Sequence, residues 1–345
     1  MSLPPRLHPP GAPTPNDGPL TDPFGRVHTY LRVSVTDRCN FRCTYCMPAE
    51  GLDWMPRETV LTFEELTRVV GIFVKLGVRK IRLTGGEPTI RKGIVELVRQ
   101  LSSLEGLEDR AMTTNALRLS GLAQPLADAG LSRVNISIDS LKADRFREMT
   151  RGGDLVRVLA GIDAAIEAGL TPVKLNAVVM RNVNDDEVVD LVRHFADRPE
   201  VQVRFIEFMP FSAVERKKRH VPAAEMRARL GEHWELRPLP GEAHAGPSVN
   251  WELGEGGPRV GFISPITEHF CQACNRLRLQ ADGHLRTCLS REAAPSLRDL
   301  MRAGISDEAL EVAIRGRIWG KVAGHEADQI ESFRPFDGAM TSVGG

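Results

Sequence analysis

Six short runs rich in β-branched and aromatic residues recur between residues 30 and 209, with segments of helical periodicity between them. The runs are 30–36, 78–85, 110–115, 132–139, 171–180 and 201–209. In residues 62–77, apolar side chains recur every three to four positions, and Thr62 and Glu65 have the spacing of a helix capping box. Six β-α units in series predict an α/β fold with a parallel sheet and right-handed crossovers. Since eight units close a complete TIM barrel, we predict an open, partial (β/α)6 barrel.

The segments on either side of this repeat differ in composition. Residues 1–25 contain eight prolines and three glycines and little apolar surface, so we expect a disordered leader over residues 1–26. A stretch rich in glycine and proline, 236–258, follows the last unit. We therefore divide the chain into a leader (1–26), a barrel (27–235) and a C-terminal region (236–345).

Charge and hydropathy exclude several partners. Basic and acidic residues are equal in number, 45 of each, so no bulk polyanion such as nucleic acid is expected to bind. No apolar run approaches the roughly 18 residues that cross a bilayer, and the N-terminus lacks the pattern of a secretory signal. We expect a cytoplasmic protein, either monomer or homodimer, in which clustered cysteines indicate metal or redox chemistry rather than disulfides.

Basic residues alternate with apolar ones in four of the predicted strands. They are Arg32, Arg82, Lys174 and Arg204. Successive strand residues point to opposite faces, so these four side chains point into the barrel if the apolar set packs under the helices. A single such residue is usually at an edge or in an ion pair, but four on four strands predict a buried cationic interior. Converging buried cations need an anion, and a polyphosphate is the obvious one.

Three of the six cysteines lie in one loop after the first predicted strand. Cys39, Cys43 and Cys46 have the spacing C-x3-C-x2-C. A structural zinc ion needs four ligands, and a redox-active dithiol leaves Cys39 unexplained. A [4Fe–4S] cluster fits three thiolates and keeps its fourth iron open for a substrate or co-substrate.

The other three cysteines form a second set, Cys271, Cys274 and Cys288, spaced C-x2-C-x13-C. A zinc site is a stronger alternative here, because His269 or His284 offers a fourth ligand. A second cluster with an open iron is the other interpretation. Arg276 and Arg278 alternate after Cys274 and so share a face, which suits a phosphate-bearing ligand.

Taken together, these motifs resemble a known family. C-x3-C-x2-C after the first strand of a β/α barrel, and "TGGEP" at 84–88, resemble the radical S-adenosylmethionine superfamily. With C-x2-C-N-R-x-R-x9-C, "LRVSVTDRCNFRCTYCMP", "RFIEFMP" and a terminal Val-Gly-Gly, residues 27–345 are similar to one family within it, the MoaA family. Its members are GTP 3′,8-cyclases, lyases of molybdenum cofactor biosynthesis.

The resemblance implies a mechanism. A low-potential donor of the flavodoxin or ferredoxin type reduces the first cluster, which cleaves S-adenosylmethionine into methionine and a 5′-deoxyadenosyl radical. That radical removes the 3′ hydrogen of GTP, and the sugar radical attacks C8 of guanine. The product, 3′,8-cyclo-7,8-dihydro-GTP, passes to cyclic pyranopterin monophosphate synthase.

The resemblance also assigns residues, with no catalytic residue beyond the two [4Fe–4S] clusters. The second cluster would hold the guanine, and the tail glycines Gly344 and Gly345 would reach the active site. S-adenosylmethionine contacts fall on Tyr45, Gly86, Ser137 and Met209. GTP contacts fall on Arg32, Arg82, Thr113, Lys174, Arg276 and Arg278, with Arg204 as a further candidate.

One departure from the family pattern bears on the backbone. Ala116 stands where the family often has glycine, so we expect the chain to avoid positive φ there. Two alternatives to the cyclase remain: a radical S-adenosylmethionine enzyme that modifies peptides and carries an auxiliary cluster, or a zinc-stapled binding module without catalysis.

Overall fold

The computed structural model of the chain describes residues 4–9, 11–209, 216–241, 246–289, 295–324 and 341. One 11-stranded sheet forms its centre, in the order β11-β10-β1-β2-β3-β4-β5-β6-β9-β8-β7. The first six strands run parallel, as predicted. They are β1 (Tyr30–Ser34), β2 (Lys80–Thr84), β3 (Asp109–Thr114), β4 (Arg133–Ser137), β5 (Val173–Val179) and β6 (Val201–Glu207).

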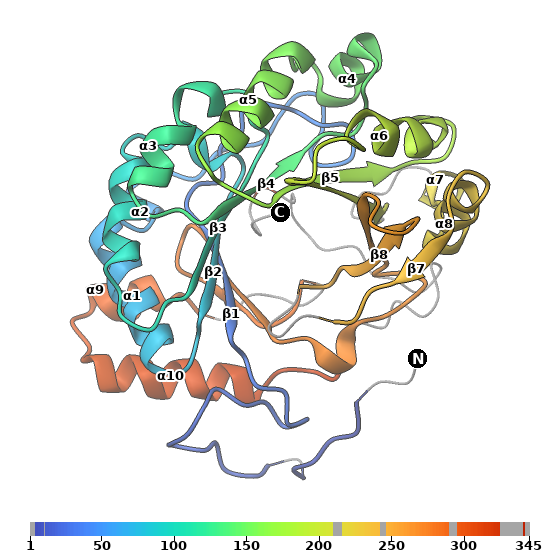
Figure 1. Cartoon of the computed structure of the whole chain (residues 1–345). Helices are drawn as coiled ribbons and strands as arrows, with labels where there is room; N and C mark the ends of the chain where they lie inside the picture. Colours follow the sequence, from blue (N-terminus) through green and yellow to red (C-terminus); the bar gives the residue numbers. More distant parts are fainter. Residues whose placement is uncertain are drawn as a thin grey trace.

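Helices follow these strands and cover the outer, convex face of the curved sheet (Figure 1). They are α1 (Phe63–Lys75), α2 (Ile94–Ser102), α3 (Ala123–Asp128), α4 (Ala143–Thr150), α5 (Leu155–Glu167) and α6 (Val188–His194). The predicted capping box starts α1: Glu65 N–H donates to Thr62 Oγ1 at 3.2 Å, and Thr62 N–H donates to Glu65 Oε2 at 2.8 Å. Leu66, Val69 and Phe73 of α1 are fully buried against the sheet, each worth about 1.5–3 kcal/mol.

The C-terminal region extends the same sheet at both edges. β9 (Arg259–Ile263) pairs in parallel with β6, and β10 (Arg276–Leu279) pairs in parallel with β1. Antiparallel strands complete the edges: β11 (Leu285–Arg286), β8 (Val249–Leu253) and β7 (Leu236–Pro238). The partial barrel is confirmed, but residues beyond 235 supply strands to it, so the sheet continues across the division expected there.

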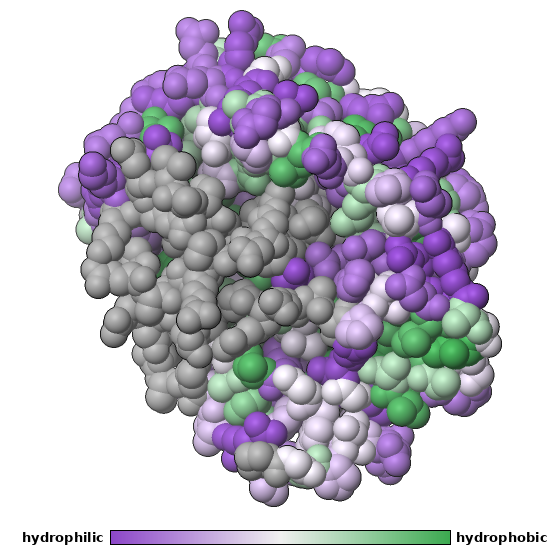
Figure 2. Space-filling view, turned by 180° about the vertical axis from the view of Figure 1, so that it is seen from behind, coloured by the Kyte–Doolittle hydropathy of each residue, from purple (hydrophilic) through white to green (hydrophobic). Residues whose placement is uncertain are grey.

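Four further helices lie in the last part of the chain: α7 (Arg216–Arg219), α8 (Ala223–Gly231), α9 (Leu297–Arg302) and α10 (Asp307–Trp319). No helix in the described ranges is both long enough and apolar enough to span a membrane. The face shown in Figure 2 is mostly hydrophilic among the residues that are coloured.

The N-terminal segment makes several contacts with the rest of the described chain. Thr21 and Val27 form an antiparallel bridge, and Leu20 is only 1% exposed. The segment runs beside α10 (Figure 1), where Trp319 Nε1 donates to Ala12 O at 2.8 Å and Arg315 Nη2 donates to Gly18 O at 2.9 Å. Side chains from α10 therefore bond backbone carbonyls of the segment for which the composition predicts disorder.

One expectation is wrong: Ala116 adopts φ +60°. The turn after β3 is fixed by its neighbours, since Ala116 N–H donates to Thr114 Oγ1 at 3.0 Å and Leu117 N–H donates to Asn115 Oδ1 at 3.1 Å. A left-handed non-glycine residue costs about 1–2 kcal/mol. These side-chain bonds, together with burial of Ala116, hold the residue in that conformation.

Candidate active site

A cavity of about 580 Å³ occupies the inside of the curved sheet. All six cysteines line it, and so does every S-adenosylmethionine and GTP residue expected from the sequence. The structure thus brings together residues between positions 32 and 288 of the chain. Gly344 and Gly345 lie outside the described residues.

The two cysteine sets sit at opposite ends of the barrel strands. Cys39, Cys43 and Cys46 follow the carboxyl end of β1, whereas Cys271 and Cys274 precede the amino end of β10. Because β10 is parallel to β1, with Arg276 in register with Tyr30, the two sets face the cavity from opposite directions. Cys288 follows β11, which returns antiparallel to β10 and therefore ends near Cys274.

The first cysteine loop is fastened to the turn after β2. Gly86 N–H donates to Thr36 O and Glu87 N–H donates to Arg38 O, both at 2.8 Å. A Cβ on Gly85 would lie 2.3 Å from Thr36 O, and one on Gly86 would lie 2.2 Å from Arg38 O. The glycines of "TGGEP" are therefore required by the backbone of the cysteine loop itself, besides any approach to a ligand.

Glu87 is the polar centre of that turn. Its carboxylate is 1% exposed and accepts bonds from Thr89 N–H at 3.0 Å, Thr114 Oγ1 at 2.7 Å and Asn115 N–H at 2.7 Å. Burial nevertheless raises its pKa. Since Asn115 Nδ2 also donates to Asn40 Oδ1 at 2.8 Å, this carboxylate links the ends of β2 and β3 to the cysteine loop.

A second buried carboxylate positions Tyr45 between the cysteines of the first set. Tyr45 Oη donates to Asp139 Oδ2 at 2.8 Å, and Val178 N–H donates to Asp139 Oδ1 at 2.8 Å. Burial raises the pKa of Asp139 to about 6, although both hydrogen bonds lower it. The bond fixes the Tyr45 ring against the wall that also carries Ser137.

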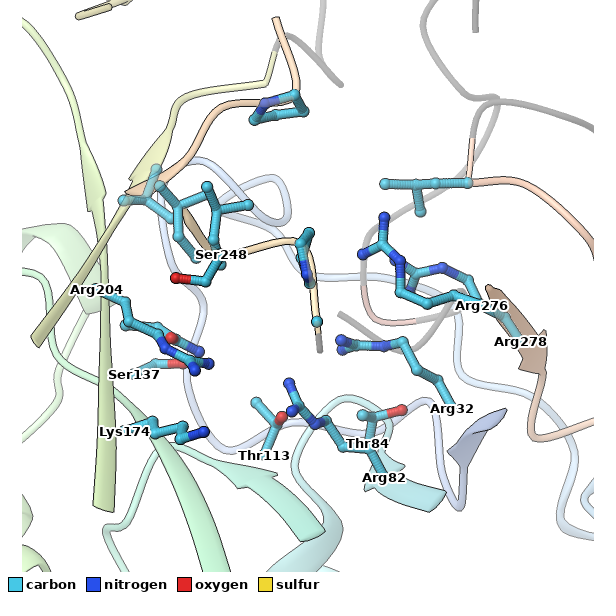
Figure 3. A pocket seen from close by; sticks show the side chains of 18 of the residues that line it. Arg32, Arg82, Thr84, Thr113, Ser137, Lys174, Arg204, Ser248, Arg276 and Arg278 are labelled. Carbon is cyan, nitrogen blue, oxygen red and sulfur yellow. The ribbon is translucent and has the colours of Figure 1, made fainter. Parts of the chain in front are cut away.

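The cavity is strongly basic. Side chains from opposite walls point toward one another across it, with Lys174 and Arg204 on one side and Arg276 and Arg278 on the other (Figure 3). Nine basic and five acidic residues line it. The basic ones are Arg32, Arg79, Lys80, Arg82, Arg133, Lys174, Arg204, Arg276 and Arg278; the acidic ones are Glu87, Glu108, Asp109, Asp139 and Glu207. This excess of buried positive charge favours a multiply charged anion.

Arg82 shows how burial among other cations disfavours the charged form of a guanidinium group. It is 8% exposed, and burial, with the charge of Arg32 and other neighbouring cations, lowers its pKa to about 9. With its amide oxygen facing Arg82, Asn135 accepts from the three guanidinium nitrogens at 2.6–3.1 Å. A polar but uncharged partner positions the guanidinium while leaving its charge for a ligand.

At the amino end of the strands, one carboxylate forms ion pairs with two basic side chains. Asp109 Oδ2 lies 3.1 Å from Lys80 Nζ and 2.5 Å from Arg133 Nη2. These residues stand at the first positions of β2, β3 and β4. The carboxylate therefore holds two cations at the end of the cavity that also contains the second cysteine set.

Several buried oxygens face the cavity without a hydrogen-bond partner in the described part of the chain. The uncharged ones are Thr84 Oγ1, Thr113 Oγ1 and Asn176 Oδ1. An unpaired buried polar atom costs roughly 1–3 kcal/mol, so three on one wall indicate a polar ligand. Thr113 was predicted, whereas Thr84 and Asn176 were not.

The two histidines considered as a fourth zinc ligand do not face the cavity beside the second cysteine set in the described part of the chain. All six cysteines are free thiols, and neither His269 nor His284 is among the described residues that line the cavity. His269 Nδ1 lies 2.9 Å from Pro265 O, and His284 Nδ1 lies 2.9 Å from Asp282 Oδ2. Over the described ranges, no three His, Cys, Asp or Glu side chains are grouped as the donors of a metal ion.

The thiols of the two sets have different electrostatic surroundings. Burial raises the pKa of Cys39 to about 11 and that of Cys46 to about 12. Burial also acts to raise the pKa of Cys274, but Lys321 and Arg276 outweigh it and lower the pKa to about 6. Metal ligation requires thiolates, and the cations beside Cys274 favour its thiolate form.

Sequence reasoning missed part of the cavity wall although the signal was present. Arg133 lies on the same face of β4 as the predicted Ser137, Asp139 continues that period of two just after the strand, and Lys80 alternates with Arg82 along β2. The same period of two that singled out Arg82 applies to them.

Models of two protein families match the chain. Radical SAM superfamily matches residues 33–195, and Molybdenum Cofactor Synthesis C matches residues 201–327. A barrel of parallel strands with C-x3-C-x2-C after the first of them agrees with that match, and the chain is a radical SAM protein. Streptococcus suis SuiB bound to S-adenosylmethionine shares the fold, with a TM-score of 0.56 at 15% identity over 84% of this chain and 68% of that chain.

Curated relatives define the family more narrowly. The chain is 51% identical over 305 residues to GTP 3′,8-cyclase of Pseudomonas putida (strain W619), covering 87% of this chain and 90% of the relative. It is 42% identical over 334 residues to GTP 3′,8-cyclase of Listeria monocytogenes serotype 4b (strain CLIP80459), covering 94% and 99%. For GTP 3′,8-cyclase of Moorella thermoacetica the identity is 44% over 327 residues, covering 94% and 100%. The chain belongs to the GTP 3′,8-cyclase family, which confirms the resemblance to MoaA.

Proposed function

We propose that this protein is a GTP 3′,8-cyclase that converts GTP to 3′,8-cyclo-7,8-dihydroguanosine 5′-triphosphate, the first step of molybdenum cofactor biosynthesis. One observation carries the proposal. A cavity lined by nine basic side chains has a set of three free cysteines at each end, in a chain that belongs to this family. The activity in the relatives' names supports the choice of GTP.

Each cysteine set would hold one [4Fe–4S] cluster. Cys39, Cys43 and Cys46 would hold the cluster that binds S-adenosylmethionine, with Tyr45, Gly86, Ser137 and Met209 around that cofactor. Cys271, Cys274 and Cys288 would hold the second. When bound, these groups supply one-electron cleavage of S-adenosylmethionine and a radical that abstracts hydrogen; the protein supplies position and shielding.

The chain's own residues bind and orient the nucleotide. Arg32, Arg276 and Arg278 approach from the neighbouring strands β1 and β10, Lys174 and Arg204 approach from the other side of the cavity, and Arg82 approaches from β2 (Figure 3). Guanidinium groups pair with phosphate oxygens in a fixed fork, so they fix the triphosphate in direction as well as in place. Thr113 adds a buried hydroxyl that has no hydrogen-bond partner in the described part of the chain and is available to the nucleotide. Burial of the cavity wall keeps bulk water from reactive intermediates.

The direct test is an anaerobic assay of the reconstituted protein. GTP, S-adenosylmethionine and dithionite are supplied together, and 5′-deoxyadenosine and the cyclised nucleotide are measured by mass spectrometry. We expect GTP to accelerate 5′-deoxyadenosine formation, whereas ATP, a matched triphosphate with another base, does not. Equal rates with GTP, with ATP and without nucleotide overturn the substrate assignment.

Metal analysis tests the cofactors separately. We expect about eight irons with matching sulfide per chain. Replacing Cys271, Cys274 and Cys288 by serine is expected to remove about half of the iron and to leave uncoupled cleavage of S-adenosylmethionine. Replacing the first set abolishes cleavage. Zinc in place of iron in the second set contradicts the proposal.

Partners follow from this chemistry. We propose that a low-potential flavodoxin or ferredoxin reduces the protein in the cytoplasm, and that cyclic pyranopterin monophosphate synthase takes up the product. Arg276→Ala is expected to weaken GTP binding about tenfold or more, since a charged hydrogen bond contributes about 1.5–3 kcal/mol. Retention of the first cluster and of uncoupled cleavage is the internal control.

A further inference from the structure

A lysine that follows the last described helix lies beside the second cysteine set. Lys321, two residues after α10, is 4% exposed. Its Nζ lies 3.0 Å from Arg276 O, to which it donates, and 3.8 Å from Cys274 Sγ. It is not among the described residues that line the cavity. No residue role expected from the sequence uses it.

A buried arginine from the N-terminal segment holds the same region together. Arg26 Nη1 donates to Cys271 O at 2.8 Å and to Ala323 O at 2.6 Å, and Nη2 donates to Val322 O at 2.7 Å. One guanidinium thus joins the backbone of the second cysteine set to the residues that directly follow Lys321.

The arginine is itself fixed by a small hairpin, residues 20–28. Arg26 Nε donates to Asp22 Oδ2 at 2.6 Å, and Asp22 is fully buried. His28 Nε2 lies 3.1 Å from the same oxygen, and the hairpin is closed by His28 N–H donating to Leu20 O at 2.7 Å. Parts of the chain that lie about 300 residues apart therefore meet behind one cysteine set.

We infer that Lys321 is a positioning residue that sets the reduction potential of the metal group on Cys271, Cys274 and Cys288, and that the hairpin 20–28 holds it there through Arg26. This inference rests on the proposed function, in which that group is an iron–sulfur cluster. A cluster becomes more negative when it gains an electron. A buried ammonium group beside a ligating sulfur stabilises the reduced state more than the oxidised one, so it raises the potential.

The test compares reconstituted wild-type protein with Lys321→Met, which keeps length and removes charge, and with Lys321→Arg, which keeps charge. The midpoint potential of each cluster is measured by redox titration followed by EPR. For K321M we expect the equilibrium constant for one-electron reduction of the second cluster to fall about tenfold, a lowering of about 59 mV. K321R is expected to restore most of that shift, and the first cluster is unaffected in both variants.

Arg315→Gln provides a matched control. Arg315 is also a buried cation that joins the C-terminal part of the chain to N-terminal carbonyls, but it bonds Asp17 O and Gly18 O rather than the cysteine segment. We expect no change in either potential. Arg26→Gln, by contrast, is expected to lower the second potential or the iron content of the second site, because Lys321 loses its support.

The outcomes separate the two proposals. A wild-type protein without a second cluster signal refutes the proposed cofactor set, and the inference with it. A second signal whose potential is the same in wild type and K321M overturns the inference alone. If K321M takes up only one cluster, Lys321→Gln is measured instead, because it keeps an N–H donor without charge. A lowered potential in K321Q then supports the inference, and an unchanged one rejects it.

Discussion

Substitution of Gly86 by alanine tests how closely the cysteine loop depends on the turn after β2. The new Cβ would lie 2.2 Å from Arg38 O, 2.4 Å from Arg38 C and 2.6 Å from Asp37 O, whereas ordinary contact begins at 3.4 Å. All three atoms are backbone, so no side-chain rotation relieves the overlap. The loop must move by about 1.2 Å, the difference between 3.4 and 2.2 Å.

The cost follows from two contributions. Overpacking of this kind costs about 1–3 kcal/mol. Movement of the cysteine loop away from the turn after β2 also weakens the bonds from Gly86 N–H to Thr36 O and from Glu87 N–H to Arg38 O, at about 1 kcal/mol each. A loss of about 3–5 kcal/mol in a chain of 345 residues lowers Tm by about 4–7 °C, given about 2.1 cal/mol/K of unfolding entropy per residue.

The assay measures Tm and iron content after anaerobic reconstitution, with 5′-deoxyadenosine formation as the functional readout. We expect G86A to lose occupancy at the first cysteine set and to lose cleavage with it, while the second set stays loaded. Gly316→Ala is the control: that glycine lies inside α10 with nothing within 4 Å of its added Cβ, so about 0.5–1 kcal/mol of stabilisation is expected. A G86A protein with wild-type Tm and full iron refutes the steric reasoning.

Three further predictions concern the cavity and its turns. Ala116→Gly should raise the free energy of unfolding by up to about 1 kcal/mol by relieving the left-handed conformation, and a clear loss in denaturant titrations contradicts this. The raised pKa of Asp139, about 6 against 3.8, means that the stability contributed by this group is fully present below pH 4 and that about 3 kcal/mol of it is lost as pH rises through 6. In Asp139→Asn that contribution disappears from the pH profile of unfolding. Asp109→Asn frees the charges of Lys80 and Arg133, so the KM for GTP should fall severalfold at low salt and depend more strongly on salt; an unchanged KM argues against their contact with the triphosphate.

The strands and their inward faces were predictable because a period of two is local information. Arg32, Arg82, Lys174 and Arg204 were assigned to the barrel interior from alternation alone, and all four line the cavity. The cysteine spacing likewise placed the first set directly after β1. These features depend on neighbours within a few positions.

What escaped prediction depends on contacts between distant segments. β9 and β10 are short, and only their pairing with β6 and β1 shows that they belong to the barrel. Positive φ at Ala116 depends on the Thr114 side chain, which bonds Glu87, and on the Asn115 side chain, which bonds Asn40. Order around Arg26 depends on carbonyls of residues 322 and 323. No local pattern contains that information.

Because β1 pairs with β10, the sheet cannot be completed around β1 until most of the chain has been synthesised. Leu31 aligns with Leu277, about 246 residues later, so a ribosome adding about 5–20 residues per second needs roughly 12–50 s to produce the partner strand. Until then one edge of β1 stays unpaired and the loop with Cys39 stays open to the surroundings. Chains that stop short of residue 276 keep an exposed strand edge, which favours aggregation.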